Sequence, residues 1–275
     1  MSTTPLLELR RVNKRFGAVQ VLNDVTFTAR AGDVTVLVGD NGAGKSTLTK
    51  CIGGIHSMDS GSYLLDGTAV NIRTASEARR FGIDIAYQDL ALCDNLDIVQ
   101  NMFLGRELHR GMVLDEPEME HIAAETLRRL SATTVRSIRQ PVYTLSGGQR
   151  QTVAIAKAIL WSSRIVVLDE PTAALGLAQT ARILELIRQL ADDGRAVVVV
   201  SHNMNDVFAV ADSIATLYLG RMAAQVRASQ LTYRQLIELI TTGSSGDLGL
   251  TASITGREKK GAWPRPMASM TAAGR

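Results

Sequence analysis

The fold of this chain is decided by residues 39–46, Gly39-Asp40-Asn41-Gly42-Ala43-Gly44-Lys45-Ser46. This stretch fits the phosphate-loop pattern GxxxxGK[S/T] in full. It follows an apolar run, Val34 to Val38, and leads into a segment with helical character, Lys45 to Ile52. Glycines let such a loop curl so that its N–H groups point at phosphate oxygens, and the helix start adds a favourable dipole. The alternative, a glycine-rich turn beside a solvated lysine, accounts for neither the complete pattern nor its context.

Two side chains of this loop carry the predicted chemistry. Lys45 supplies positive charge to the β- and γ-phosphates of a nucleotide, and the Ser46 hydroxyl is a ligand for Mg²⁺. We therefore predict that residues 39–46, together with Thr47, bind ATP and Mg²⁺.

A second polar site follows the apolar run Ile165 to Leu168, which ends in Asp169 and Glu170. Strand ends of an open parallel sheet face the ligand crevice. We predict that Asp169 holds Mg²⁺, usually through water. Glu170 is predicted to orient and deprotonate the water that attacks the γ-phosphorus. A solvated acidic turn is the alternative.

The remaining pattern predicts an α/β fold with a parallel sheet. The apolar runs 165–168 and 197–200 flank a helical segment, 177–191, and so form a βαβ unit. Several other elements are predicted: strands within 6–38, a hairpin over 58–72, a short helix over 75–81, a strand over 83–87, and helices over 117–130 and 149–160.

Composition narrows the class of protein. The 275 residues include 45% hydrophobic side chains and carry a formal net charge of +3, an excess too small to argue for nucleic acid binding. Two cysteines indicate a reducing compartment. Met1 to Pro5 has no apolar signal core, and the apolar runs are far shorter than the ~20 residues that span a bilayer. Any membrane role must come through a partner.

The stretch Leu145-Ser146-Gly147-Gly148-Gln149 resembles the signature of ABC ATPases. Four further positions match that family's pattern in order: Phe16 as the aromatic that stacks on adenine, Gln88 as the Q-loop, Pro171 to Leu175 as the D-loop, and His202 as the switch histidine. Each has a structural alternative. Phe16 fits a core position, Gln88 a polar strand end, and His202 a hydrogen-bonded loop.

The resemblance implies a P-loop NTPase (RecA-like) core with a mostly parallel sheet, an antiparallel β-subdomain and an inserted α-helical subdomain. The core would comprise residues 1–88 and 164–242, the helical subdomain 89–163, and a flexible tail 243–275. Catalysis would involve Lys45, Gln88, Glu170 and His202, with Gln88 also a Mg²⁺ ligand. The signature residues Ser146, Gly147, Gly148 and Gln149 would complete the ATP site of a second, identical protomer.

Further stretches look like bacterial monosaccharide importers of the ribose, xylose and fructose type: 87–96, 101–107, 170–176 and 201–204. This narrower resemblance implies a single-cassette subunit at the cytoplasmic face of the inner membrane. Its partners would be permease subunits and, indirectly, an extracytoplasmic sugar-binding protein. The alternatives are an exporter subunit, a non-transport ABC ATPase and an inactive binding module. One position departs from many family members, which carry Asp where this chain has Gly176.

Coupling to a permease is expected from the segment between Asp89 and Glu107, which mixes many apolar residues with few charges. Some of these residues, such as Leu92 and Met102, are predicted to form a groove for a short permease helix. The alternative is that all of them pack within the subdomain.

Overall fold

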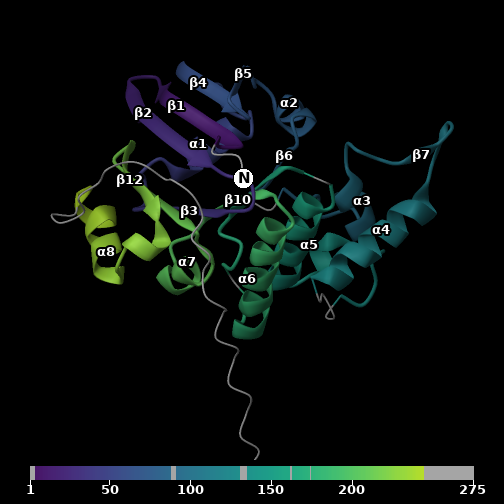
Figure 1. Ribbon diagram of the computed structural model, residues 1–275. Helices are drawn as coiled ribbons and strands as arrows, with labels where there is room; N and C mark the ends of the chain where they lie inside the picture. Colours follow the sequence, from purple (N-terminus) through teal and green to yellow (C-terminus); the bar gives the residue numbers. More distant parts are fainter. Residues whose placement is uncertain (1–3, 88–90, 131–134, 162, 174, 245–275) are drawn as a thin grey trace, which may run out of the picture.

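The computed structural model describes residues 4–87, 91–130, 135–161, 163–173 and 175–244 (Figure 1). At its centre lies a six-stranded sheet in the order β12-β11-β3-β10-β9-β6. The strands are β3 (Val34–Gly39), β6 (Ile83–Ala86), β9 (Ile165–Asp169), β10 (Ala196–Val200), β11 (Ser213–Tyr218) and β12 (Arg221–Arg227).

Five of these strands are parallel, and only β12 runs antiparallel to its neighbour β11. The strands β3, β9 and β10 are nearly continuous apolar runs because both faces of the sheet are covered. The predicted βαβ unit is confirmed, since β9 and β10 pair in parallel with Ile165 opposite Ala196.

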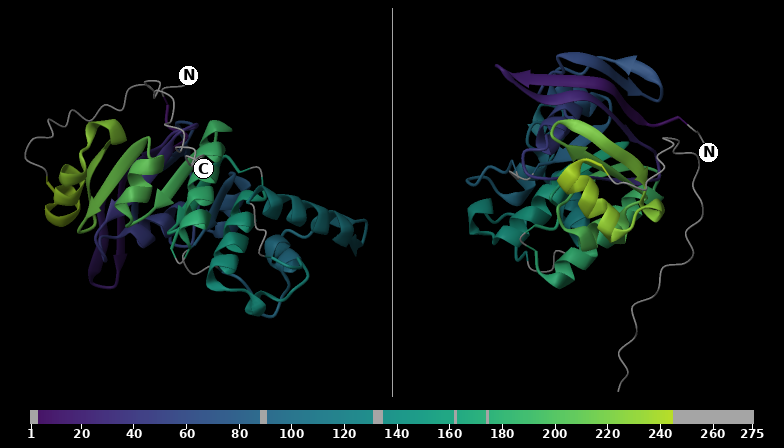
Figure 2. Two further views of the ribbon diagram at one scale, coloured as in Figure 1. Left: turned by 90° about the horizontal axis from the view of Figure 1, so that it is seen from below. Right: turned by 90° about the vertical axis from the view of Figure 1, so that its left-hand side faces the viewer.

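A second, antiparallel sheet has the order β2-β1-β4-β5 and covers one face of the central sheet (Figure 1). Its strands are β1 (Leu7–Phe16), β2 (Val19–Ala29), β4 (Ser60–Leu65) and β5 (Thr68–Val70). Helices α1 (Lys45–Ile52) and α2 (Ala75–Arg80) lie on the same side of the central sheet as this layer and contribute residues to the same core. Phe27 and Tyr63 are fully buried in the core between the two sheets. The right-hand view of Figure 2 shows the purple and blue strands of this layer above the green ones.

Helices cover the other face of the central sheet. They are α5 (Gly147–Ile159), α6 (Leu177–Asp192), α7 (Met204–Val210) and α8 (Tyr233–Thr242). Their apolar faces pack on the inner residues of β3, β9 and β10 and form one continuous core. Successive residues of these strands therefore point alternately into the core below the helices and the core below the antiparallel sheet.

The described residues between β6 and α5 form an arm that projects from the sheet (Figure 2, left). It contains α3 (Ile98–Phe103), α4 (Glu116–Arg129), a short 3-10 helix η1 (Val142–Thr144) and the hairpin β7 (His109–Arg110) and β8 (Val113–Leu114). Arg139 ties the arm together, with ion pairs to Asp97 at 3.1 Å, Glu116 at 2.7 Å and Glu120 at 2.6 Å.

One side chain joins the edges of the two sheets. The Gln225 amide on β12 donates to the Thr28 carbonyl at 2.6 Å and accepts from the Thr28 N–H at 3.1 Å. It thereby makes the pair of hydrogen bonds that a neighbouring strand would make to β2. A backbone bond from Asn23 N–H to Gly220 O, 2.8 Å long, joins the same edges.

Most predicted elements are present with ends shifted by a few residues. The antiparallel hairpin over 58–72 is β4 and β5, the short helix is α2, and the helices over 117–130 and 149–160 are α4 and α5. Within the range predicted as a helical subdomain, 89–163, residues 109–114 form a short β-hairpin that the sequence patterns do not predict. There Gly111, with φ +69°, turns the chain into a hairpin. The predicted tail lies outside the described residues beyond Ser244, and Gly243 caps α8.

Candidate functional site

The loop that joins β3 to α1 forms one wall of the site. Gly39, Gly42 and Gly44 all have positive φ values, of +153°, +80° and +103°. A Cβ on Gly44 would also lie 2.9 Å from Leu22 Cδ2 and 3.1 Å from Val21 O. The glycines at 39 and 44 are therefore required both by backbone conformation and by close packing against neighbouring strands.

Lys45 begins α1 and folds back over this loop. Its Nζ donates to the carbonyl oxygens of Gly39 at 2.9 Å and Asp40 at 3.0 Å. Ser46 and Thr47 follow it in the first turn, and both line the same cleft as Lys45. The ammonium group therefore sits inside the loop that the sequence predicts to cradle phosphate.

Asp169 and Glu170 form the opposite wall, at the carboxyl end of β9. Glu170 has a left-handed backbone conformation, with φ +52°, which is unfavourable for a residue with a Cβ. Its backbone is held on both sides: its N–H donates to Val200 O at 3.0 Å, and its carbonyl accepts from Gln151 Nε2 at 3.3 Å. This loop thus aims a buried carboxylate into the cleft.

His202 follows β10 and completes this wall. Its Nδ1 lies 2.8 Å from Oε1 of Glu170, while 75% of the His202 side chain remains exposed. The cleft between the two walls has a volume of about 500 Å³. It is lined by residues of the phosphate loop and of both strand ends: Val21, Asn41, Gly42, Gly44, Lys45, Ser46, Thr47, Asp169, Glu170, Ala173, Val200 and His202.

Asp169 is 6% exposed, and its environment is unfavourable for a negative charge. Burial raises the pKa of this carboxyl group to about 6, and the neighbouring Glu170 adds to the shift, while Lys45 and Lys50 oppose it. A cation placed beside Asp169 would relieve this cost, because it would stabilise the ionised form.

The remaining predicted residues lie elsewhere. Phe16, 43% exposed, ends β1 outside the cleft lining, and its ring meets that of His56 edge-on at 5.0 Å. Ser146 caps α5: its hydroxyl accepts from Gln149 N–H at 3.3 Å, and Gln149 Oε1 accepts from Ser146 N–H at 2.9 Å. None of the four signature residues, 146–149, is part of the described cleft lining. Gln88 lies outside the described residues.

Some contributors to the site, among them Gln151 and Val21, were not predicted from sequence. Gln151, in the second turn of α5, holds the Glu170 backbone, and Val21 of β2 lines the cleft. Gln151 lies two residues after the predicted signature, so its position on a helix beside β9 could have suggested a contact. No local pattern marks Val21.

The comparisons with known proteins agree with this geometry. Residues 22–173, more than half of the chain, match the family model described as ABC transporter. The chain belongs to the ABC transporter family. It is an ATPase of the ABC type, and its fold is the predicted P-loop architecture with an added antiparallel sheet and helices.

Curated relatives extend the match over most of this ABC cassette. The fructose import ATP-binding protein FrcA of Rhizobium meliloti is 41% identical, over 88% of this chain and 95% of the relative. The xylose/arabinose import ATP-binding protein XylG of Sulfolobus acidocaldarius is 38% identical, over 89% and 97%. The ribose import ATP-binding protein RbsA 2 of Escherichia coli O157:H7 is 38% identical, but the match covers only 49% of it.

Solved structures share the fold of this ABC cassette. A dimeric bacterial ABC transporter cassette superposes with a TM-score of 0.71 at 26% identity, covering 81% of this chain and 98% of that one. A dimer of the same cassette in a post-hydrolysis state, bound to ADP and Pi, superposes with the same TM-score at 28% identity.

The residues present fit a magnesium nucleotide. The loop 39–44 offers a backbone concavity to phosphate, and Ser46 and Asp169 bring one hydroxyl and one carboxylate to the same cleft. One hydroxyl and one carboxylate are a donor set that fits Mg²⁺, which binds through one or two protein ligands, phosphates and water rather than an all-protein cage.

Replacing Asp169 by Asn should stabilise the nucleotide-free ABC cassette. Because the folded-state pKa of Asp169 is raised, the folded protein binds an extra proton between about pH 4 and pH 6, and the unfolding free energy falls as pH rises through that window. Asparagine removes this loss. We expect Asp169→Asn to gain roughly 2 kcal/mol above pH 7 and less toward pH 4.

Thermal unfolding in EDTA at pH 4.5 and pH 8 measures this gain. Asp193→Asn, at the exposed end of α6, is the control and should change neither melting temperature appreciably. Equal melting temperatures for Asp169→Asn and the native chain at pH 8 would contradict the expectation.

Proposed function

We propose that this chain hydrolyses Mg-ATP as the energy-supplying subunit of an importer for a simple sugar. The observation that carries the proposal is the cleft in which Lys45, Asp169, Glu170 and His202 meet, in a chain 41% identical to a fructose import ATP-binding protein. The same four residues argue against the alternative of an inactive binding module.

Within the cleft each residue has a distinct role. The loop amides and Lys45 would hold the β- and γ-phosphates, and Ser46 and Asp169 would hold Mg²⁺, whose charge would neutralise that of the phosphates. Glu170 accepts the proton of the attacking water, and His202, in contact with Glu170, faces the γ-phosphate. Gln88 is proposed to bind Mg²⁺ from the segment after β6, and Phe16 to stack on adenine.

The signature residues are proposed to act on a second copy of the chain. Ser146 and Gly147 are exposed at the start of α5, outside the cleft of their own chain. A helix start offers N–H groups to an anion, so this end of α5 suits the γ-phosphate of ATP held by another protomer. The proposed homodimer would close around two ATP molecules and open when hydrolysis removes that bridge.

The membrane partner is proposed to dock in a groove of about 270 Å³ between the core and the arm. Among the described residues no helix is both long and apolar enough to cross a bilayer. We place the chain at the cytoplasmic face of the inner membrane, held there by permease subunits that meet an extracytoplasmic sugar-binding protein. The groove lies beside Tyr87 and Ala91, which flank the segment containing Gln88.

The exposure of the apolar residues within 89–107 shows which of them a permease helix could contact. Met102 borders the groove but is 1% exposed, and Ile98 and Phe103 are equally buried, so these three belong to the core. A charge at Met102 would therefore disrupt the core and could not test docking alone, although Met102 is one of the residues predicted to form the groove. Leu92 is half-buried and packs on the same core, whereas Leu104 lines the groove and is 41% exposed.

Leu104→Glu should separate hydrolysis from transport. A charge at this apolar position of the groove opposes the packing of a permease helix on Leu104 but costs little stability, because the position is exposed. We expect the basal ATPase activity and the melting temperature to stay near the native values. Copurification with the permease and the stimulation of ATPase activity by sugar should each fall by at least about ten-fold.

Ile237→Glu is the matched control, because Ile237 is 38% exposed and lies on α8, at the opposite end of the molecule (Figure 1). It should leave copurification and stimulation unchanged. Full sugar uptake with Leu104→Glu would place the docking surface elsewhere.

The proposed function itself is tested by reconstituting the chain with the permease encoded beside its gene. ATP-dependent uptake of a labelled monosaccharide into vesicles, dependent on a sugar-binding protein, is the expected result. Efflux, or ATPase activity that no permease stimulates, would favour an exporter or a non-transport ABC ATPase.

A further inference from the structure

We propose that Thr172 and Asp206 are positioning residues for hydrolysis, which hold the Glu170 loop and the His202 loop in register through one partly buried hydrogen bond. The inference rests on the proposed function, because it assigns a role to residues that do not themselves face the cleft.

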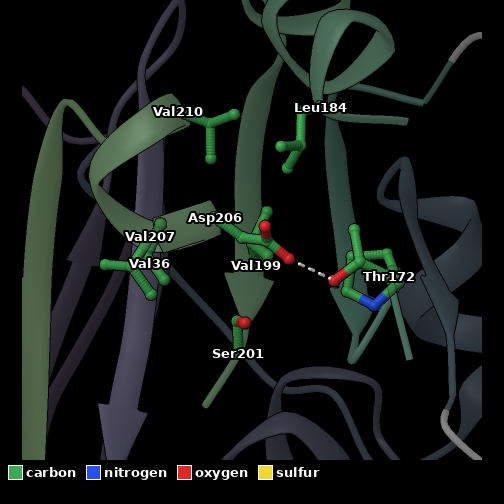
Figure 3. A pocket seen from close by; sticks show the side chains of 9 residues that line it. Val36, Thr172, Leu184, Val199, Ser201, Asp206, Val207 and Val210 are labelled. Atoms are coloured by element: carbon green, nitrogen blue, oxygen red, sulfur yellow. Dashed lines mark hydrogen bonds between the residues drawn. The ribbon is translucent and has the colours of Figure 1, made fainter. Parts of the chain in front are cut away.

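The contact joins segments that are 34 residues apart in the sequence. The Thr172 hydroxyl donates to Oδ2 of Asp206 at 2.6 Å. Thr172 lies two residues after Glu170 in the loop that follows β9, and Asp206 lies in the first turn of α7, four residues after His202. Figure 3 shows the two side chains pointing toward each other from these two elements.

The surroundings make this bond strong and isolated. Asp206 is 7% exposed, and the pair borders an internal cavity of only about 10 Å³. The other walls of this cavity are mainly apolar side chains of the central sheet, α6 and α7: Val36, Leu184, Val199, Val207 and Val210 (Figure 3). A hydrogen bond to a carboxylate is shorter and stronger than one between neutral groups, and loss of the Thr172 hydroxyl removes this partner from the buried Asp206 carboxylate.

The backbone of Glu170 explains why such a restraint is needed. Its φ of +52° is unfavourable for a residue with a side chain and persists only where the surrounding structure holds it. Four contacts act directly on Glu170. Its N–H donates to Val200 O, its carbonyl accepts from Gln151 Nε2 and from Ala173 N–H, and its carboxylate contacts His202. The bond between Thr172 and Asp206 is a fifth restraint, on the side of the loop away from the cleft.

Two of these contacts join the loop after β9 to the segment after β10, one on each side of the strand ends. Glu170 and His202 meet on the cleft side, and Thr172 and Asp206 meet on the buried side. A shift of the loop after β9 therefore moves α7 and His202 with it. Because a misplacement of about 1 Å can reduce a catalytic rate about a hundred-fold, the buried pair should act on hydrolysis without touching nucleotide.

The test uses variants that remove or keep the hydrogen bond. Thr172→Val removes the hydroxyl at constant shape, Asp206→Leu removes the acceptor, and Asp206→Asn keeps a carbonyl oxygen for the hydroxyl. We expect Thr172→Val and Asp206→Leu to lower kcat for Mg-ATP about ten-fold, with the dissociation constant for ATP changed less than about two-fold. Asp206→Asn should stay near the native kcat. The double variant Thr172→Val with Asp206→Leu should fall no further than either single variant.

A buried pair of hydroxyl groups far from the cleft provides the control for stability. Thr35 and Ser213 lie 3.0 Å apart, at the far end of β3 and β11 from the cleft. Thr35→Val should lower the melting temperature and leave kcat per folded molecule unchanged. If Asp206→Leu does not fold, Thr172→Val alone decides.

The outcomes separate this inference from the proposed function. Native kcat in Thr172→Val, in a chain that hydrolyses Mg-ATP and is inactivated by Glu170→Gln, overturns the inference alone. Equal losses of kcat in Thr172→Val and Thr35→Val overturn it also, because the effect is then general destabilisation. A native chain that does not hydrolyse Mg-ATP overturns the proposed function, and this inference with it.

Discussion

Glu170→Gln should abolish hydrolysis while leaving ATP bound. Glutamine keeps the size of the side chain and can still contact His202 Nδ1, but it cannot accept the proton of the attacking water. General base catalysis contributes about 10² to 10⁴ in rate, so we expect kcat to fall by at least about a hundred-fold. ATP affinity should stay near the native value, because the phosphate loop and Lys45 are intact.

The same variant should reveal the dimer. If ATP joins the phosphate loop of one chain to the signature of another, a chain that cannot hydrolyse ATP accumulates as an ATP-bound dimer. Size-exclusion chromatography with Mg-ATP should show a dimer for Glu170→Gln and mainly monomer without nucleotide. Glu185→Gln, at an exposed position on α6, is the control and should hydrolyse ATP normally. Native turnover in Glu170→Gln would assign the base to another residue.

Lys45→Ala should impair both binding and hydrolysis. The ammonium group now bonded to the Gly39 and Asp40 carbonyls is within reach of phosphates in the same loop, and alanine removes its charge from every stage of the reaction. A hydrogen bond to a charged group contributes about 1.5 to 3 kcal/mol, which corresponds to a weakening of ATP binding by about ten-fold to more than a hundred-fold. Hydrolysis should fall to background.

Calorimetric titration of ATP and measurement of phosphate release provide the two readouts. Lys50→Ala, in the last turn of the same helix, controls for damage to α1 and should retain most of the affinity. If Lys45→Ala bound and hydrolysed ATP like the native chain, Lys45 would not belong to the nucleotide site.

The sequence predicts those parts of the fold that depend on local patterns. The run Val34 to Val38, the glycine loop and the helix after it form one strand-turn-helix unit, and the structure places it as predicted. The hairpin of β7 and β8 is not predicted, because strands of two residues are too short to show an alternation of apolar and polar residues. Gly111 alone marks the turn. From the sequence, residues 213–227 are placed in the core, within the range 164–242, but neither β11 nor β12 is predicted as a strand. The turn Leu219-Gly220 between them is not flanked by a long apolar run that would mark two strands.

For the site, the sequence predicts residues carried by motifs and misses those recruited by packing. Lys45, Asp169, Glu170 and His202 meet in one cleft as expected. The pair Thr172 and Asp206 could not be predicted, because its partners become neighbours only when β9 and β10 pair in the sheet. Phe16 illustrates the same limit, since its contact with His56 depends on the chain that follows α1.

The amide of Gln225 has a consequence for solubility. An outer strand with free N–H and C=O groups is a template on which other chains can add strands and aggregate. The long strand β2 is such an outer strand, and Gln225 occupies both backbone groups of Thr28 on it. Together with the bond from Asn23 N–H to Gly220 O, these contacts hold the edge strands β2 and β12 side by side, so that each covers part of the other's backbone. A side chain thus protects the edge without extending either sheet by a further strand.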